Sequence, residues 1–194
     1  MTLTRLLPTL RRSIPDPIVP GKWPTGTRVT TTDVIVGGFS MSRLAERDGT
    51  PLVHLDPTPS GRTGDPLRHR GVALATVRTI ASGDGERRLE LDAELGPHHP
   101  DWAEARLIGR VSVAKVAPVA VRFRAGGCHA RATLELPGDL VVGDLIAVPI
   151  EAPRVTISVA GAVWAAQRSA GATSAANSSS PERSYAASGV YRMA

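Results

Sequence analysis

The sequence predicts a mainly β protein: an antiparallel β-barrel or sandwich with one or two short helices and extended N- and C-terminal arms. Residues 87–95 alternate apolar and charged side chains, which is the period of a half-buried strand. Residues 119–136 contain two more alternating segments separated by Gly126 and Gly127, the pattern of a β-hairpin. Turn residues recur at short spacing along the chain, which favours antiparallel strands over alternating strands and helices.

Residues 1–27 form a Pro-rich N-terminal arm in this interpretation. Four leucines between residues 3 and 10 have helical spacing, but Pro8 interrupts them, so we expect one short turn of helix at most. Four further prolines and two glycines between residues 13 and 27 favour extended backbone. Trp23 is the expected anchor of this arm.

The β domain is predicted to span residues 28–165. Its expected strands are residues 28–36, 52–55, 72–81, 87–95, 107–113, 119–124, 130–136, 145–150 and 154–159. Ser40 as N-cap and Gly49 as stop signal predict a helix over residues 40–47, and Pro100 opens a second short helix that ends at Arg106. The expected core residues share strand faces: Leu89, Leu91, Leu95, Val119, Val121, Phe123, Leu134, Leu136, Val155 and Ile157.

Residues 166–194 form an Ala/Ser-rich C-terminal arm with too little apolar bulk for a core of its own. Neither arm is expected to become ordered within its own chain, so both should dock on a neighbouring subunit. The residues with enough apolar area to make such assembly contacts are Leu6, Leu7, Leu10, Trp23, Tyr185 and Tyr191.

The charge is basic, with 23 Lys and Arg residues against 18 Asp and Glu residues and a net charge of +5. These cations are scattered and do not form one basic run, so the balance alone does not require nucleic acid. Candidate contacts for nucleic acid or an acidic partner are Arg11, Arg12, Arg122, Arg124 and Arg131. The competing interpretation of the last three is a solvated sheet face with cross-strand ion pairs.

Cys128 is the single cysteine, so an intrachain disulfide is excluded, and we expect a buried thiol near a hairpin turn. No apolar run approaches the roughly 18 residues of a spanning helix, and residues 1–12 lack the features of a secretory signal. Membrane spans and signal-directed secretion are therefore not predicted.

Histidines next to acidic residues are the strongest candidates for chemistry. His98, His99 and Asp101 lie together in the sequence, but adjacent loop histidines seldom reach one metal ion. Cys128 and His129 are neighbours on a strand and should point to opposite faces. The Gly-rich residues 60–65 lack a P-loop ending. We therefore predict no catalytic residues, no cofactor, no metal and no small-molecule substrate.

Residues 37–56 resemble the N-terminal entry of diaminopimelate decarboxylase-type enzymes, in which a short helix precedes a Gly-Thr-Pro and a strand. The resemblance implies a barrel of about 250 residues and a lysine that forms an aldimine with pyridoxal phosphate. This chain has 194 residues, and neither Lys22 nor Lys115 lies in the expected context. The favoured interpretation is a coincidental succession of helix, turn and strand.

The Arg-rich, Lys-poor composition, the small β body, the segment 136–149 and the extended termini look like structural proteins of tailed bacteriophages of GC-rich, actinobacterial hosts. This resemblance implies a non-enzymatic head, head-to-tail joining or tail subunit of the virion. Its partners would be copies of itself, other virion proteins and packaged DNA. Two alternatives stay open: a small nucleic-acid-binding β-barrel of a bacterial host, and an unrecognised enzyme. The enzyme would need a pocket that joins His54, His98, His99 or His129 to a carboxylate.

Overall fold

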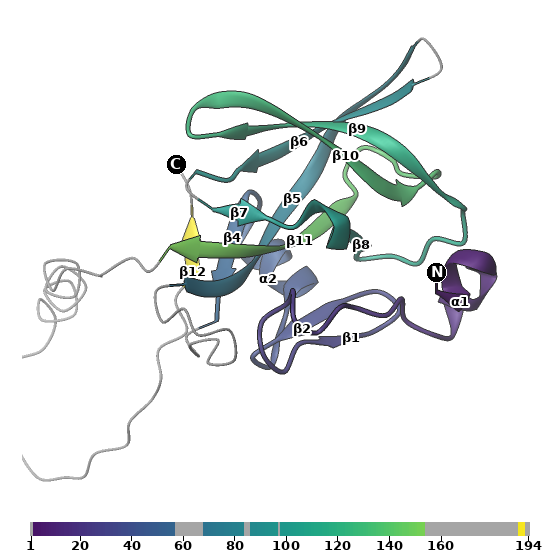
Figure 1. Ribbon diagram of the computed structural model, residues 1–194, viewed down its shortest axis with the longest axis horizontal. Helices are drawn as coiled ribbons and strands as arrows, with labels where there is room; N and C mark the ends of the chain where they lie inside the picture. Colours follow the sequence, from purple (N-terminus) through teal and green to yellow (C-terminus); the bar gives the residue numbers. More distant parts are fainter. Residues whose placement is uncertain (1, 57–67, 84–85, 97, 154–189, 193–194) are drawn as a thin grey trace, which may run out of the picture.

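The computed structural model describes residues 2–56, 68–83, 86–96, 98–153 and 190–192. Its main feature is a curled mixed sheet that forms a half-barrel, as Figure 1 shows. The strand order is β10-β9-β6-β5-β11-β7, with β4 and β8 added at the β5 and β11 side. The prediction of a mainly β fold with short helices is confirmed.

The elements before the sheet are short. They are α1 (Leu3–Leu6), the 3₁₀ helix η1 (Pro8–Arg12), β1 (Arg28–Val29), β2 (Val34–Val36), β3 (Phe39–Ser40) and α2 (Met41–Asp48). Strands β1, β2 and β3 form a small antiparallel sheet of their own. The predicted continuous strand over residues 28–36 is therefore wrong, because residues 30–33 turn the chain: the hydroxyl of Thr30 accepts hydrogen bonds from the backbone N–H groups of residues 32 and 33.

The larger strands are β4 (Leu52–Leu55), β5 (Arg68–Gly83), β6 (Glu86–Glu94), β9 (Val116–Ala125), β10 (Cys128–Pro137) and β11 (Leu145–Pro153). Shorter elements are β7 (His99–Pro100), the 3₁₀ helix η2 (Trp102–Glu104), β8 (Arg106–Ile108) and β12 (Val190–Arg192). The second predicted helix is thus a single 3₁₀ turn, and the expected strand over residues 107–113 ends at Ile108. The expected strand over residues 154–159 lies outside the described residues.

Both predicted hairpins are present. β5 pairs with β6 so that Ile80 faces Leu89, and β9 pairs with β10 so that Phe123 faces Ala130. The two hairpins then meet through β6 and β9, which run parallel. Parallel neighbours require a long crossover, and the chain supplies one in the segment that carries β7, η2 and β8. The sheet is therefore mixed, where an antiparallel one was expected.

Two hydrophobic cores lie on either side of β5 and β11. Val77 and Ile146 face the interior of the curled sheet, with eight of the predicted core residues: Leu89, Leu91, Leu95, Val119, Val121, Phe123, Leu134 and Leu136. Val72 and Leu74 face the opposite side, where they pack with Trp23 and residues of α2 and β2. This alternation explains why β5 is apolar on both faces. Val155 and Ile157 lie outside the described residues.

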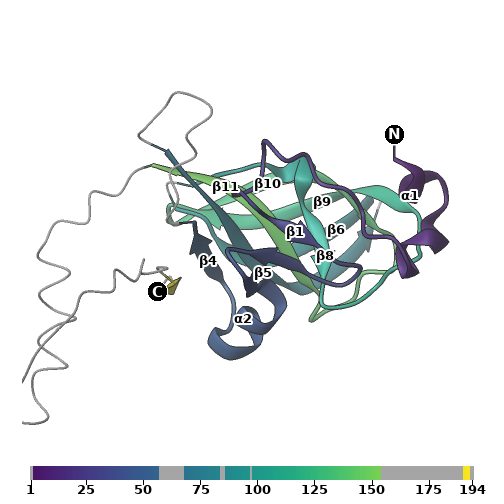
Figure 2. The ribbon, with the colours of Figure 1, turned by 90° about the horizontal axis from the view of Figure 1, so that it is seen from below.

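Helix α2 lies against this second core, below β5 in Figure 2. Its N-terminus is capped as predicted, because the Ser40 hydroxyl accepts a hydrogen bond from the N–H of Arg43 at 3.2 Å. Its end is set by Gly49, whose φ of 80° favours glycine. A second glycine is needed for packing: a Cβ at Gly71 would lie 2.6 Å from the carbonyl oxygen of His54 on the adjacent strand.

The N-terminal arm packs on its own β domain. The side chain of Trp23 is 0% exposed, and its Nε1 donates a hydrogen bond to Glu104 at 3.0 Å. Arg106 clamps the arm by donating to the carbonyl oxygens of Asp16 and Pro17. The expectation that this arm needs a neighbouring subunit for order is therefore corrected, since its anchor is buried in a hydrophobic core of the same chain. β12 likewise pairs with β4, with Tyr191 opposite Val53.

Candidate functional site

An acidic groove joins a histidine to carboxylates at the end of β7, and we call it the His99 groove. Its lining comes from three segments of the chain: Lys22, His99, Pro100, Asp101, Trp102, Pro149, Ile150 and Glu151. Its volume is about 280 Å³. His99 on β7 is directly opposite Glu151 on β11 in the strand register, so the two side chains leave the sheet on the same face. Asp101 is held by its backbone N–H, which donates to the carbonyl of Pro149 at 2.9 Å.

The groove carries a formal excess of negative charge. Lys22 Nζ lies 2.8 Å from Asp101 Oδ2, and the Lys22 side chain is 56% exposed. The hydrogen bond and the charge of Asp101 raise the pKa of Lys22, with smaller contributions from Glu151 and Glu104. The groove thus presents carboxylates beside an ammonium group, and carboxylates attract a ligand that carries a positive charge.

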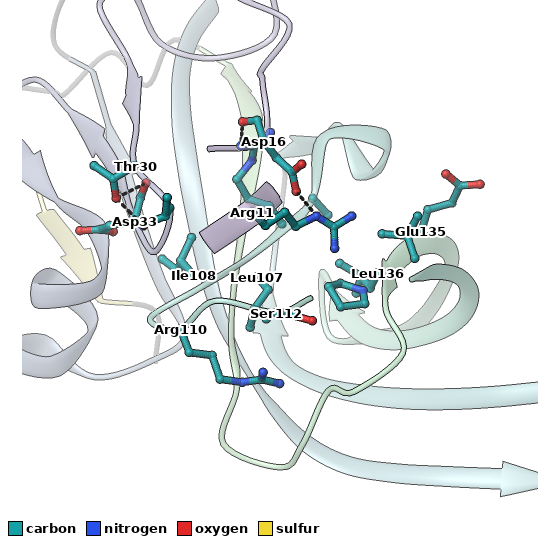
Figure 3. A pocket seen from close by; sticks show the side chains of 15 residues that line it. Arg11, Asp16, Thr30, Asp33, Leu107, Ile108, Arg110, Ser112, Glu135 and Leu136 are labelled. Carbon is teal, nitrogen blue, oxygen red and sulfur yellow. Dashed lines mark hydrogen bonds and ion pairs between the residues drawn. The ribbon is translucent and has the colours of Figure 1, made fainter. Parts of the chain in front are cut away.

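A second cavity lies under the N-terminal arm, and we call it the Arg11 cavity (Figure 3). Its volume is about 80 Å³, and it is bounded by the arm, the β1–β2 turn, β8 and the end of β10. Arg11 extends into the space between Asp16 and Leu136. Of the Arg11 side chain only 7% is exposed, although the residue is charged.

The structure separates the histidines named by the sequence. His54 is buried in β4 beside the Phe39 ring, with ring centroids 5.6 Å apart, and burial lowers its pKa. Burial also lowers the pKa of His98, and only His99 lines the groove. His129 and Cys128 are exposed at the start of β10, so the expected buried thiol is wrong: the residue lies at the rim of the hairpin turn. Residues 60–65 lie outside the described chain.

The arginines of the sequence-predicted contact set have different environments. Arg122 and Arg131 are opposite each other on exposed faces of β9 and β10, whereas Arg124 pairs with Glu94 at 3.4 Å. Arg12 is exposed, but Arg11 is buried and cannot reach a nucleic acid in this arrangement. The prediction for Arg11 is therefore corrected, because the arm folds over it.

The apolar residues proposed for assembly also differ. Leu6 and Leu7 are 58% and 54% exposed, so they remain available to a partner. Trp23 is not available, because its ring is buried within its own chain. Tyr185 lies outside the described residues. No helix in the described part of the chain has the length and apolar character needed to cross a bilayer.

Comparison with known proteins identifies similarity to decarboxylases. No family model matches the sequence. A diaminopimelate decarboxylase of Actinosynnema pretiosum subsp. auranticum is 39% identical over 56 residues, which are 29% of this chain and 13% of that protein. The chain therefore matches only a small part of this relative's length.

Solved decarboxylases give weak structural matches. A crystal structure of diaminopimelate decarboxylase aligns with a TM-score of 0.28 and 19% identity, over 40% of this chain and 23% of that one. Lysine/ornithine decarboxylase from Vibrio vulnificus, complexed with cadaverine, gives 0.28 and 14%, over 46% and 26%. Arginine decarboxylase of the Paramecium bursaria Chlorella virus gives 0.29 and 15%, over 46% and 27%. Superpositions at these TM-scores do not establish a shared fold.

These findings overturn the prediction of a tailed-phage virion subunit without enzymatic function. The curated relative reported above is an enzyme, a diaminopimelate decarboxylase. The resemblance of residues 37–56 to diaminopimelate decarboxylases was set aside above as coincidence. The relative from Actinosynnema pretiosum belongs to the same family of enzymes. The open alternative of an unrecognised enzyme is the one that the comparisons support.

Pyridoxal phosphate does not fit the lysines of this chain. A lysine that forms an aldimine must be available in its neutral form within a site. Lys22 is exposed and ion-paired, and Asp101 raises its pKa, which holds it in the charged form. Lys115, the other lysine, is exposed. We therefore derive no catalytic step through this cofactor.

No group of three or more His, Cys, Asp or Glu side chains is placed to hold a metal ion within the described residues. The His99 groove itself contains an imidazole, two carboxylates and an ammonium group. An imidazole such as that of His99 is the kind of group that serves in general acid–base catalysis, and carboxylates such as those of Asp101 and Glu151 can hold an ammonium group.

Proposed function

We propose that this protein is an enzyme related to the amino-acid decarboxylases, and that it acts on a small amino acid or amine that carries an ammonium group. The observation that carries the proposal is the 39% identity to a diaminopimelate decarboxylase over 56 residues. Diaminopimelate has two ammonium groups and two carboxylates. The His99 groove offers a complementary set of charges.

The groove already holds one alkylammonium group, the side chain of Lys22. Its 2.8 Å contact with Asp101 shows that an ammonium nitrogen fits against that carboxylate. Since Lys22 is more than half exposed, this ion pair is weak, and a substrate ammonium group can displace it. Lys22 would then be free to pair with a substrate carboxylate.

His99 is the proposed proton-transfer residue. It lines the groove together with Lys22 and Asp101, and it lies opposite Glu151 in the strand register. Imidazole side chains serve as proton donors and acceptors in general acid–base catalysis. The reaction step assigned to this chain is therefore proton transfer to or from a bound amine or its neighbouring carbon.

Binding and turnover test the proposal separately. Calorimetry should show binding of meso-diaminopimelate or L-lysine, and weaker binding of L-norleucine, which lacks the side-chain ammonium. Proton NMR in D₂O should show substrate consumption or exchange of a carbon-bound proton. Asp101→Asn should weaken binding about tenfold or more, and His99→Gln should slow turnover about 10²-fold or more with less effect on binding.

Glu86→Gln is the matched control, because Glu86 is an exposed carboxylate outside the His99 groove. It should leave both measurements unchanged. Absence of binding for all ammonium-bearing ligands, or equal loss in Glu86→Gln and Asp101→Asn, would refute the assignment of the groove. Binding without any turnover would refute the enzymatic function.

A further inference from the structure

The Arg11 cavity contains polar groups that the protein itself does not satisfy. Arg11 Nη1 donates to the carbonyl of Ala114 at 3.0 Å, but Nη2 is buried without a hydrogen-bond partner. Arg11 Nε lies 3.0 Å from Asp16 Oδ2 as an ion pair, without a hydrogen bond. Arg106 Nε and Asp16 Oδ1 are also buried and unpartnered. The three donors and one acceptor belong to Arg11, Arg106 and Asp16, all of which line the cavity.

Unpaired charged groups in a protein interior are costly, so native structures supply a partner for them. Leaving an N–H group of a buried guanidinium without a hydrogen-bond acceptor is especially unfavourable. The cavity of about 80 Å³ is large enough for several water molecules or for one small ligand. The arrangement of the unpaired groups distinguishes between these two occupants.

The other charges around the cavity already have partners. Arg110 donates from Nε and Nη2 to Asp144, with both distances 2.7 Å. Asp33 caps the start of α2 by accepting from the N–H of Ser42 at 3.0 Å. Glu135 pairs with Arg5 at the surface.

Arg11 pairs with the Asp16 carboxylate at 3.0 Å, whereas Arg106 donates to the backbone carbonyl oxygens of Asp16 and Pro17. Glu104 lies 4.0 Å from Arg106, and it also accepts hydrogen bonds from Trp23 and the N–H of Val19. Among the residues that line the cavity, Arg11, Arg106 and Arg110 formally balance Asp16, Asp33 and Glu135. The preference for an anion therefore rests on the buried guanidinium donors that lack an acceptor.

We propose that the Arg11 cavity binds a small oxyanion that also carries a hydrogen-bond donor. The oxyanion would accept from Arg11 Nη2 and Nε and from Arg106 Nε, and its donor would bind Asp16 Oδ1. Hydrogencarbonate, hydrogenphosphate and glycine share this chemistry and are small enough to be tested as probes. Formate has the anionic oxygens without the donor, so it should bind more weakly.

Binding at this place would fasten the N-terminal arm to the barrel. Arg11 and Asp16 belong to the arm, whereas Arg106 belongs to β8. A ligand that contacts all three joins the two parts and should slow hydrogen exchange in residues 8–16. This readout does not depend on any enzymatic activity.

The experiment measures binding of hydrogencarbonate, phosphate, glycine and formate to the full chain by calorimetry, with chloride at equal ionic strength as reference. At least one donor-bearing oxyanion should bind, and formate should bind about tenfold more weakly. Arg11→Gln should abolish this binding. Arg11→Lys, which keeps the charge but loses the fork of donors, should weaken it about tenfold if the first variant does not fold.

Arg12→Gln is the control, because Arg12 is the exposed neighbour of Arg11 on the same 3₁₀ helix. It should bind as the parent does. If no probe binds better than chloride, the cavity holds water alone and the proposal is wrong. Equal loss of binding in Arg12→Gln, or binding without slower exchange in residues 8–16, would place the anion elsewhere and would also overturn it.

Discussion

Replacing Trp23 by alanine tests whether the N-terminal arm is part of the folded domain. Its side chain is 0% exposed and packs in the core formed with α2 and β5. A buried tryptophan removes about 150–250 Å² from water, which at about 25 cal/mol per Å² corresponds to about 4–6 kcal/mol. Measured costs of such truncations are about 3–5 kcal/mol, so we expect Trp23→Ala to lower the free energy of unfolding by that amount.

Trp23→Phe separates the ring from its N–H group. The indole donates to Glu104 at 3.0 Å, and Arg106 lies over the ring with its guanidinium carbon 5.2 Å from the centroid. Phenylalanine keeps most of the apolar contact, and Glu104 retains the hydrogen bond from the N–H of Val19. This variant should therefore cost less, about 1–3 kcal/mol.

The assay is equilibrium urea unfolding followed by circular dichroism, combined with limited trypsin digestion. Cleavage after Arg12 and Lys22 should accelerate in Trp23→Ala, because an undocked arm exposes its backbone. If the arm opens before the barrel unfolds, the measured loss in the free energy of unfolding is limited to the free energy with which the arm docks. Faster proteolysis of the arm detects that case. A free energy of unfolding within about 0.5 kcal/mol of the parent, with unchanged cleavage, would refute the docking described here.

Three further predictions concern the barrel. Phe123→Ala should cost about 3–5 kcal/mol in urea unfolding, because Phe123 is 7% exposed and its ring centroid lies 4.6 Å from that of Trp102; an unchanged midpoint would show that the side chain is not in the core. Burial lowers the pKa of His54 below its ordinary 6.5, so the unfolded chain takes up its proton first as pH falls. Stability should therefore decrease below about pH 6.5 and level off below the folded pKa, with a slope of at most about 1.4 kcal/mol per pH unit from this group; a His54→Gln profile as steep as the parent's would contradict this. Arg122 and Arg131 are like charges directly opposite each other, so Arg131→Glu should raise the free energy of unfolding by about 0.2–1 kcal/mol and with it the melting temperature. A melting temperature below that of the parent would show that the pair is not repulsive.

Local patterns in the sequence were sufficient for much of the fold. The alternation around Leu89 and Phe123 predicted two hairpins and eight core residues, because the side chains of a strand alternate between its faces whatever the strand packs against. Ser40 and Gly49 predicted α2 for a similar reason, since both act on backbone groups within one turn. The function of a virion subunit was inferred from amino-acid composition and from a general resemblance to phage structural proteins. That inference had no such physical basis, and it was wrong.

Contacts between distant segments were decided only by the tertiary structure. The parallel pairing of β6 with β9 depends on how two hairpins meet, which no local pattern records. The His99 groove combines Lys22, the β7 region and Glu151, which are separated by up to 129 residues (151 minus 22). Sequence counting also treats every arginine alike, yet Arg11 is buried under the arm while its neighbour Arg12 is exposed. Burial and charge pairing set the chemistry of each candidate site, and both arise from the long-range packing of the folded chain.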